Sequence, residues 1–389
     1  MVHHCRLHNR RPHEGGVCRT HNNKCNTRHN NFDTRLCLNH RCSRCTKYAH
    51  HSGRKLKQEM KKIIGIGNAL VDVLAKLQDD ELLEVFGLSK GGMTLIGDVE
   101  QSRIQERFAS LDVERATGGS AGNTMLALAN LSMQPGFIGA VGDDTTGHFF
   151  VETCSDKGIT PYLVKLPQQS GIAYTFISPN GERTFATYLG AAAMMAPDNI
   201  DGSMFEGYDY LYVEGYLVQN HALILRAVEL AKYMGLKICL DLASYNVVEA
   251  DKEFFNLLLT EYVDIVFANE EEARAFTGAT PERALEQLHE LCEIAVVKLG
   301  AGGSMIMRKG EKVTVEAMPV SEVLDTTAAG DFYAAGVLYG LLHGYGLRQC
   351  AEVGSLLAGH VIQTLGTKLD AASWDEIRME VSRITGVES

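Results

Sequence analysis

The sequence from residue 60 onward predicts an α/β fold, with a mainly parallel central sheet and helices on both faces of that sheet. Short apolar runs of strand-like composition alternate with longer stretches of helical periodicity. The runs are apolar throughout, which is typical of strands that are buried on both faces. Alternation of this kind indicates a parallel sheet, and ligands of such sheets bind beyond the carboxyl ends of the strands.

Six segments have the pattern of central strands, and helical patterns fill the intervals and the C-terminal part. The strands are expected at residues 62–67, 136–141, 210–213, 237–240, 264–268 and 294–298. The helices are expected at residues 121–131, 145–157, 221–234, 252–261, 281–291, 331–343, 347–365 and 373–385. We therefore expect residues 60–389 to form one large domain.

Two stretches break this alternation and predict a small second sheet. Residues 171–189 alternate polar and apolar side chains on either side of a turn-forming Ser-Pro-Asn-Gly sequence at 178–181. Residues 89–97 show the same alternation. Together with residues 70–77, they are expected to form a β-sheet lid.

The composition narrows the class of protein. The 389 residues are 45% hydrophobic and carry a net charge of −11, which is normal for a globular protein and unfavourable for general nucleic-acid binding. No apolar run reaches the length of a membrane span, and no secretory signal is recognisable. We expect a cytoplasmic protein, because four widely spaced cysteines have the surroundings of reduced core thiols. These are Cys154, Cys239, Cys292 and Cys350.

Residues 1–59 differ sharply from the rest. They contain 13 Lys and Arg against three acidic residues, a net charge of +10, together with nine histidines and six cysteines. This segment lacks hydrophobic periodicity and cannot bury a core. Its composition favours sequence upstream of a natural start at Met60, and a disordered basic tail is the second interpretation. The third is a metal site at Cys37, His40, Cys42 and Cys45, for which no second Cys pair of similar spacing exists.

The most informative motif is Asp-Thr-Thr-Ala-Ala-Gly-Asp at residues 325–331, which leads directly into an apolar helical segment. The unpaired N–H groups and the dipole of a helix start form a site for an anion such as phosphate. A carboxylate placed there fits a base that takes the proton of a hydroxyl attacking the phosphate, the role expected for Asp331. The alternative is that Asp331 is an ordinary helix-start residue.

Two segments in the first half of the domain could bind hydroxyl groups. Asp72 follows the first strand, where a carboxylate can accept two sugar hydroxyls or lie solvated in a loop. Residues 118–124, Gly-Gly-Ser-Ala-Gly-Asn-Thr, precede a helix, and their glycines allow the backbone to approach a ligand. Asn123 offers both a donor and an acceptor. The alternative is an ordinary helix start with Ser120 as N-cap.

Two segments in the second half could bind a nucleotide. Asn-Glu-Glu-Glu at 269–272 follows an apolar strand, so Glu272 could bind Mg²⁺ through water or lie in an acidic first helical turn. The glycine-rich residues 297–303 form either a plain turn or a backbone wall beside a nucleotide. A dinucleotide fingerprint is not completed at residues 65–70, because Leu70 takes the third glycine position, and the chain has no P-loop.

The order of these segments resembles the ribokinase-like (PfkB) kinases of sugars and nucleosides, over nearly all of residues 60–389. Residues 118–124 and the Gly-Glu-Arg-Thr at 181–184 are similar to the adenosine-kinase-like branch. The resemblance implies a ribokinase-like fold that uses ATP and Mg²⁺, and it leaves a requirement for a monovalent cation open.

The resemblance implies that the chemistry takes place at the start of the apolar helix. Asp331 would be the catalytic base, and the backbone of Ala328, Ala329 and Gly330 would hold the transferred phosphate. Ala328 stands where the family usually has glycine, and its methyl group restricts the torsions of this turn. A second group would bind the acceptor: Asp72, Gly118, Gly119, Asn123 and Arg183. Arg183 lies in the lid and would reach either the substrate or the phosphate.

ATP and Mg²⁺ would bind beside this turn. Asn269 and Glu272 match the family's Asn-x-x-Glu motif, which organises Mg²⁺ and phosphate, with Glu272 reaching the metal through water. The rest of ATP would lie beside a third group: Lys298, Gly300, Gly303 and His360. Lys298 replaces the small hydroxyl residue that usually precedes the glycine turn, so its contact with ATP departs from the family pattern.

We therefore expect an ATP-dependent kinase that phosphorylates a hydroxymethyl group of a nucleoside. The expected reaction is adenosine to AMP, a purine-salvage step, and a sugar such as ribose or fructose is the alternative acceptor. A nicotinamide-dependent oxidoreductase is disfavoured by the incomplete glycine fingerprint. A non-catalytic binder would depend on residues 1–59. The expected partner is a small molecule, not nucleic acid or membrane, and monomer and homodimer stay open.

Overall fold

The computed structural model describes residues 18–20, 23–25 and 60–386. The chain divides into two compact units, Met1–Glu59 and Met60–Ser389. Within the first unit, two short strands, β1 (Cys18–Thr20) and β2 (Asn23–Cys25), pair antiparallel. The metal site considered at Cys37, His40, Cys42 and Cys45 lies outside the described residues, and the interpretations of this segment stay predictions.

The second unit contains a central sheet of nine strands, in the order β16-β15-β14-β13-β12-β11-β3-β7-β8. Seven neighbouring strands, from β14 to β8, run parallel, while β15 and β16 add antiparallel at one edge. The strands are β3 (Ile63–Ile66), β7 (Gly136–Gly142), β8 (Thr160–Leu166), β11 (Tyr210–Glu214), β12 (Lys237–Asp241), β13 (Ile265–Asn269), β14 (Ile294–Lys298), β15 (Ser304–Arg308) and β16 (Glu311–Val315). The predicted mainly parallel sheet, including all six expected strands, is confirmed.

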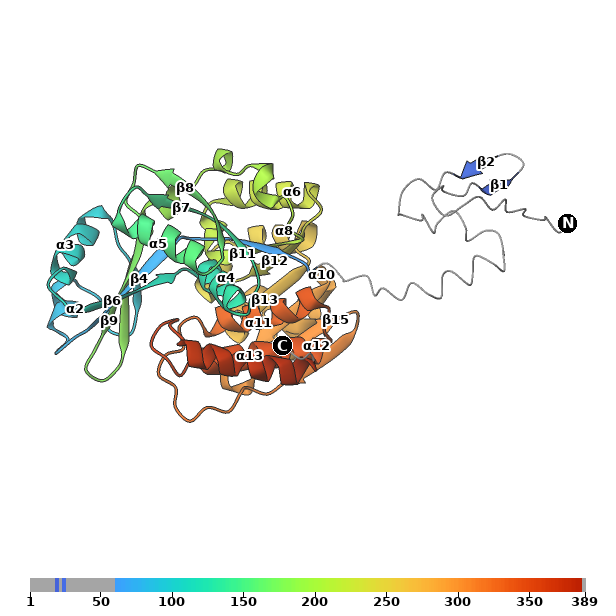
Figure 1. Ribbon diagram of the computed structural model, residues 1–389. Coiled ribbons are helices and arrows are strands. Elements are labelled where there is room, and N and C mark those ends of the chain that lie inside the picture. Colours follow the sequence, from blue (N-terminus) through green and yellow to red (C-terminus); the bar gives the residue numbers. More distant parts are fainter. Residues whose placement is uncertain (1–17, 21–22, 26–59, 387–389) are drawn as a thin grey trace. The chain divides into compact units, whose positions relative to one another are not determined.

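Helices cover both faces of this sheet (Figure 1). One face packs on α4 (Ser120–Asn130), α5 (Thr145–Asp156), α11 (Ala329–His343), α12 (Leu347–Val361) and α13 (Ala371–Thr385). The other packs on α6 (His221–Tyr233), α7 (Tyr245–Ala250), α8 (Lys252–Glu261), α9 (Glu270–Thr277) and α10 (Pro281–Leu291). Adjacent strand residues enter different cores: Ile63 belongs to the first cluster and Ile64 to the second. This double burial explains why the strands are apolar throughout.

A second sheet of five strands forms, in the order β5-β10-β9-β4-β6. Its strands are β4 (Leu70–Lys76), β5 (Met93–Leu95), β6 (Val113–Gly118), β9 (Gly171–Ile177) and β10 (Arg183–Tyr188). Two helices accompany it, α2 (Glu81–Val85) and α3 (Asp98–Phe108). Phe108 of α3 packs edge-on against Tyr174 and Phe176 of β9, with ring centroids 4.8 and 5.0 Å apart.

Among the elements that the sequence did not predict are β6, α2 and α3, which belong to this part of the fold, and β8, an edge strand of the central sheet. Glu114 and Arg115 in the first half of β6 are exposed, and only its last three residues are buried. The strand is therefore too short and too polar to be recognised from its hydrophobic pattern. Pro161 and Lys165 similarly interrupt β8. The strand expected across residues 89–97 is confined to β5, which follows two glycines.

Close packing of glycines fixes α11, the helix that carries the 325–331 motif at its start. A Cβ added to Gly336 would lie 2.6 Å from the Cα of Gly354 in α12, and one added to Gly340 would lie 2.7 Å from Cys350 Sγ. The two helix backbones therefore approach more closely than side chains allow. This contact holds the helix start in one position relative to the sheet.

Replacement of Gly336 by Ala should destabilise the protein by about 1–3 kcal/mol, because the added methyl would overlap the α12 backbone. This cost should exceed the gain in helix propensity of about 1 kcal/mol. Gly202→Ala is the matched control, since a Cβ there meets nothing within 4 Å. Thermal and denaturant unfolding measure both variants, and equal midpoints for the two would contradict the packing argument.

Candidate active site

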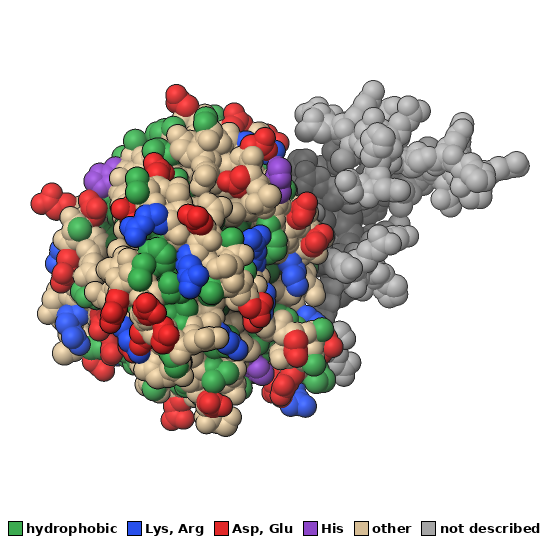
Figure 2. All heavy atoms as spheres, turned by 90° about the vertical axis from the view of Figure 1, so that its left-hand side faces the viewer, with side chains coloured by type: hydrophobic (Ala, Val, Ile, Leu, Met, Phe, Trp, Pro, Cys, Tyr) green, Lys and Arg blue, Asp and Glu red, His purple; other side chains and the backbone are tan. Residues whose placement is uncertain are grey.

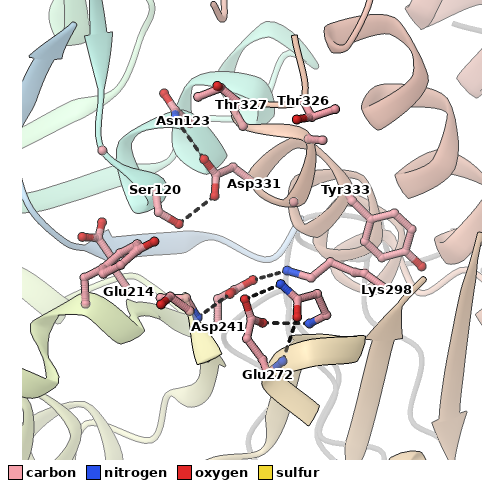
Figure 3. Close-up of a pocket in the computed structure, with 18 of the residues that line it drawn as sticks. Ser120, Asn123, Glu214, Asp241, Glu272, Lys298, Thr326, Thr327, Asp331 and Tyr333 are labelled. Atoms are coloured by element: carbon pink, nitrogen blue, oxygen red, sulfur yellow. Dashed lines mark hydrogen bonds and ion pairs between the residues drawn. The ribbon is translucent and has the colours of Figure 1, made fainter. Parts of the chain in front are cut away.

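A cavity of about 1250 Å³ lies at the carboxyl ends of the central strands, as expected for a parallel sheet. Its wall combines strand ends of the large sheet, residues of β4, β5, β9 and β10 in the small sheet, and the start of α11. Figure 3 shows the polar part of this wall. The labelled side chains there are Ser120, Asn123, Glu214, Asp241, Glu272, Lys298, Thr326, Thr327, Asp331 and Tyr333.

Asp331 lies in the first turn of α11, and its carboxylate lies between two donors from α4 (Figure 3). Ser120 Oγ donates to Asp331 Oδ1 at 2.7 Å, and Asn123 Nδ2 donates to Oδ2 at 2.9 Å. Burial raises the pKa of Asp331 to about 6, against the effect of these two hydrogen bonds, and the charge of Asp241 adds to the rise. Such a carboxylate is ionised at neutral pH and more basic than an exposed aspartate, which suits a general base.

The turn before Asp331 has a left-handed backbone. Ala328, the N-cap of α11, has φ 62° and ψ 2°. An alanine in this region costs about 1–2 kcal/mol relative to the right-handed one, which agrees with the restriction expected for its methyl group. Ala328, Ala329 and Gly330 all line the cavity. The Ala329 N–H donates to the Thr326 carbonyl at 3.2 Å. The other first-turn amides have no carbonyl partner four residues earlier, as at any helix start, so they can bind an anion.

Four neighbouring strands end in polar residues of the cavity wall. Glu214 ends β11, Asp241 ends β12, Asn269 ends β13 and Lys298 ends β14. Asn269 and Lys298 were expected from the sequence as site residues, whereas Glu214 and Asp241 were not. The available signal was a polar residue at the end of an apolar strand, the pattern that also describes Asn269.

Asn269 and Glu272 hold each other at the start of α9. The Asn269 backbone N–H donates to Glu272 Oε2 at 2.7 Å, and the Glu272 N–H donates to Asn269 Oδ1 at 2.8 Å. This capping box fixes the Glu272 carboxylate toward the cavity. Burial raises the pKa of Glu272 to about 7, with Lys298 opposing and Asp241 supporting the rise.

Glu214 connects the end of β11 to the start of α4. It is 2% exposed and accepts hydrogen bonds from Asn68 Nδ2 at 2.7 Å and from the Ala121 N–H at 3.0 Å. Burial raises the pKa of Glu214 to about 7, although these hydrogen bonds lower it. The carboxylate therefore positions the helix that presents Ser120 and Asn123 to Asp331.

Asp72 of β4 lies beside two glycines, Gly118 at the end of β6 and Gly119 directly after it. A Cβ added to Gly118 would lie 2.4 Å from Asp72 Oδ1, so the glycine leaves room for the carboxylate. Gly119 has φ 84°, and a Cβ there would lie 2.1 Å from the carbonyl oxygen of Asn68. Asp72, Gly119 and Asn123 line the cavity, while Gly118 lies behind Asp72. Their contacts with an acceptor stay predictions.

Arg183 of β10 pairs with Asp325, the first residue of the 325–331 motif. The two side chains are 9% and 2% exposed, and Asp325 also accepts the N–H groups of Thr327 at 2.9 Å and Gly366 at 2.8 Å. Arg183 is not part of the cavity lining, and within the described residues its Nε and Nη2 have no hydrogen-bond partner. The pair ties the small sheet to the 325–331 turn, and the expected contact of Arg183 with substrate or phosphate stays a prediction.

The pKa of Asp72 reflects this charge cluster. Burial raises it to about 7, the charges of Asp325 and Asp331 add to the rise, and Arg183 opposes it. Asp72 is therefore a carboxylate that changes its protonation state close to neutral pH.

The glycine turn after β14 forms another part of the wall. Gly300 and Gly303 line the cavity, and Gly303 has φ 84° with a Cβ position only 2.1 Å from the carbonyl oxygen of Val315. His360 itself does not line the cavity, but its neighbours Ala358, Gly359 and Ile362 do. Burial lowers the pKa of His360.

Other classes of site find little support in the described part of the chain. Its His, Cys, Asp and Glu side chains form no group of three or more that could hold a metal ion by itself. On the face shown in Figure 2, acidic and basic side chains are interspersed, without the basic stripe typical of nucleic-acid binding. Of the described helices, none combines the length and hydropathy that crossing a bilayer requires.

Comparison with known proteins assigns the family. The pfkB family carbohydrate kinase profile matches residues 80–374, so the chain belongs to this family of ATP-dependent kinases. An adenosine kinase structure from Sinorhizobium meliloti is 33% identical, with a TM-score of 0.73 over 82% of this chain and 99% of that one. A probable sugar kinase structure from Rhizobium etli is 30% identical, with a TM-score of 0.73 over 82% and 98%. A 5-dehydro-2-deoxygluconokinase from Shouchella clausii is 28% identical over 74% of this chain and 92% of its own length.

The family confirms the resemblance seen in the sequence, the ribokinase-like fold and the kinase class. The chain is thus a sugar or nucleoside kinase. The acceptor is not settled by family membership, because adenosine kinases and sugar kinases occur among these relatives at similar identity.

Replacement of Asp325 by Asn should lower the free energy of unfolding by about 3 kcal/mol or more, because it leaves the buried Arg183 without a counter-charge. Urea denaturation followed by circular dichroism measures the loss. The matched control is Asp143→Asn, which breaks an exposed pair with Lys165 of 2.9 Å and should change stability little. Equal effects of the two substitutions would show that the Arg183–Asp325 pair is not a structural tie.

Proposed function

We propose that this chain transfers the γ-phosphoryl group of ATP to the hydroxymethyl group of a nucleoside, converting adenosine to AMP. The observation that carries the proposal is the position of Asp331. Its carboxylate lies at the start of α11, in the wall of the cavity that also contains Asn269 and Glu272. Proton acceptor, anion-binding turn and acidic strand ends therefore face one space.

The proposed reaction is a direct in-line displacement. Asp331 accepts the proton of the hydroxymethyl group while the oxygen forms a bond to the γ-phosphorus. The bond between the γ-phosphorus and the β,γ-bridging oxygen breaks, and ADP leaves. Ser120 and Asn123 orient the carboxylate through the hydrogen bonds described above, and the amides of the 328–331 turn stabilise the charge on the phosphoryl oxygens.

The apolar end of the cavity supports a nucleoside rather than a simple sugar. Met93 and Leu95 of the edge strand β5 line the cavity, yet they are 56% and 52% exposed. Large apolar side chains exposed in a cavity favour a flat apolar ligand such as a nucleobase. The same region is lined by Leu70, Phe185, Leu189, Ala192 and Ala193. Asp72 could accept the ribose hydroxyls, and so could Oδ1 of Asn123, which has no hydrogen-bond partner among the described residues.

The charge of the cavity supports a neutral acceptor. Among the described residues that line it, Lys298 has the only basic side chain, and this pairs with Asp241 at 2.8 Å. A sugar acid would lack a cation at its carboxylate. The acceptor suggested by the 5-dehydro-2-deoxygluconokinase relatives is therefore less suitable than a neutral nucleoside, and the similarity to the Sinorhizobium adenosine kinase supports adenosine.

The residues present fit Mg²⁺. This ion keeps several waters and needs only one or two protein carboxylates besides the phosphates. Glu272 and Asp241 supply hard oxygen atoms. Burial is the main cause of the raised pKa of Glu272, and repulsion from Asp241, which a cation would relieve, adds to it. Bound Mg²⁺ would neutralise phosphate charge. The described residues give no reason to invoke a monovalent cation.

Asp331→Asn should lower turnover by about 10²–10⁴-fold, because the amide cannot accept the hydroxyl proton. In the wild type, kcat/KM should fall as the pH drops below about 7, since Asp72 and then Asp331 gain protons. A pH series of initial rates measures both effects, and the melting temperature of the variant serves as the control for folding. A variant that folds normally and keeps wild-type turnover would contradict the role of Asp331.

A panel of acceptors tests the substrate directly. Adenosine, guanosine, inosine, ribose, fructose and 5-dehydro-2-deoxygluconate would be compared in a coupled ADP-release assay at equal concentrations. We expect the highest kcat/KM with adenosine. A higher value with any sugar would overturn the nucleoside assignment, while leaving the kinase class intact.

A further inference from the structure

Lys298 places a positive charge in the wall of the cavity. It ends β14, and its ammonium lies 2.8 Å from Asp241 Oδ2 (Figure 3). The side chain is 14% exposed and belongs to the cavity lining. An ammonium has three N–H donors, and this single contact uses one of them.

The same ammonium adjoins the anion-binding turn. A Cβ added to Gly330 would lie 3.2 Å from Lys298 Nζ, with the Lys298 side chain as its nearest neighbour. Gly330 belongs to the first turn of α11, whose N–H groups and dipole favour an anion. Two sources of positive charge, the helix start and the ammonium, therefore border one volume.

The surroundings keep Lys298 charged. Burial acts to lower its pKa, but Asp241 and Glu272 outweigh burial, Asp331 contributes in the same direction, and the net pKa is raised. A lysine side chain is an ammonium at neutral pH even without such neighbours, and the contact with Asp241 favours this form.

We propose that Lys298 is a catalytic residue that donates hydrogen bonds to the γ-phosphoryl group of bound ATP, with Asp241 as the residue that positions it. The cavity is lined by five carboxylates: Asp72, Glu214, Asp241, Glu272 and Asp331. Among these negative charges, Lys298 supplies a positive charge that stabilises the phosphoryl oxygens while the γ-phosphorus binds the acceptor and separates from ADP. This role differs from a contact with the ribose or adenine, which the glycine turn alone would imply. It rests on the kinase class and requires no particular acceptor.

The alternative is that Lys298 and Asp241 form a purely structural pair, and the chain offers a matched example. Lys232, in the last turn of α6, pairs with Asp264 at 2.7 Å. Asp264 precedes β13, so this pair lies at the amino ends of the strands, away from the cavity. Loss of Lys232 removes a Lys–Asp pair without touching the site.

The test compares nucleotides that differ in the γ-phosphate. Isothermal titration calorimetry would measure ADP and the non-hydrolysable analogue adenosine 5′-(β,γ-imido)triphosphate, each with Mg²⁺, on wild type, Lys298→Met and Lys232→Met. We expect Lys298→Met to weaken binding of the analogue by about 10–100-fold, the range for hydrogen bonds to a charged group. ADP binding should change by less than about threefold, and Lys232→Met should change neither.

Lys298→Gln covers the case in which Lys298→Met fails to fold, because its amide can still donate to Asp241 without carrying charge. It should show the same selective loss for the analogue. Equal losses for ADP and analogue, or no loss for either, would overturn the proposal and leave Lys298 a structural residue. Since no acceptor is present, these results are independent of whether adenosine is the substrate.

Discussion

Desolvation and mutual repulsion of clustered carboxylates are the constraint on which this site depends. Five of them line one cavity: Asp72, Glu214, Asp241, Glu272 and Asp331. The fold holds them with groups of opposite polarity, namely the starts of α4, α9 and α11 and the ammonium of Lys298. The three helix starts follow β6, β13 and β16, and Lys298 ends a fourth strand, β14, so the site exists only when both sheets are assembled.

The clustering of these carboxylates lowers the free energy of unfolding, and their desolvation makes the proposed base Asp331 more basic. Burial raises the pKa values of Asp72, Glu214 and Glu272 to about 7, well above those of an unfolded chain. The native protein therefore binds protons more tightly than the unfolded one, and these groups reduce its stability as the pH rises from about 4 to 7. A further cost arises at Ala328, whose methyl group is held at positive φ. Such costs are typical of functional sites, where the surrounding core compensates them.

The sequence predicted the framework of the molecule better than its details. The apolar strands and the 325–331 motif were recognisable because each depends on residues adjacent in the chain. Asp241 and Glu214 were not predicted as site residues. A single carboxylate at the end of a strand does not by itself indicate a site, and only the pairing of neighbouring strands places these two beside the other carboxylates. The Arg183–Asp325 pair, which joins residues far apart in the chain, left no local pattern. Likewise β6 escaped, because its exposed half hides the strand periodicity.

The central claim is that Asp331 accepts the proton of the acceptor hydroxyl. The most direct measurement is a crystal structure of this chain with adenosine and a non-hydrolysable ATP analogue. We predict that the 5′-hydroxyl oxygen lies within about 3.2 Å of the Asp331 carboxylate and in line with the γ-phosphorus. A structure in which that hydroxyl binds elsewhere, while Asp331 keeps only its contacts with Ser120 and Asn123, would contradict the claim.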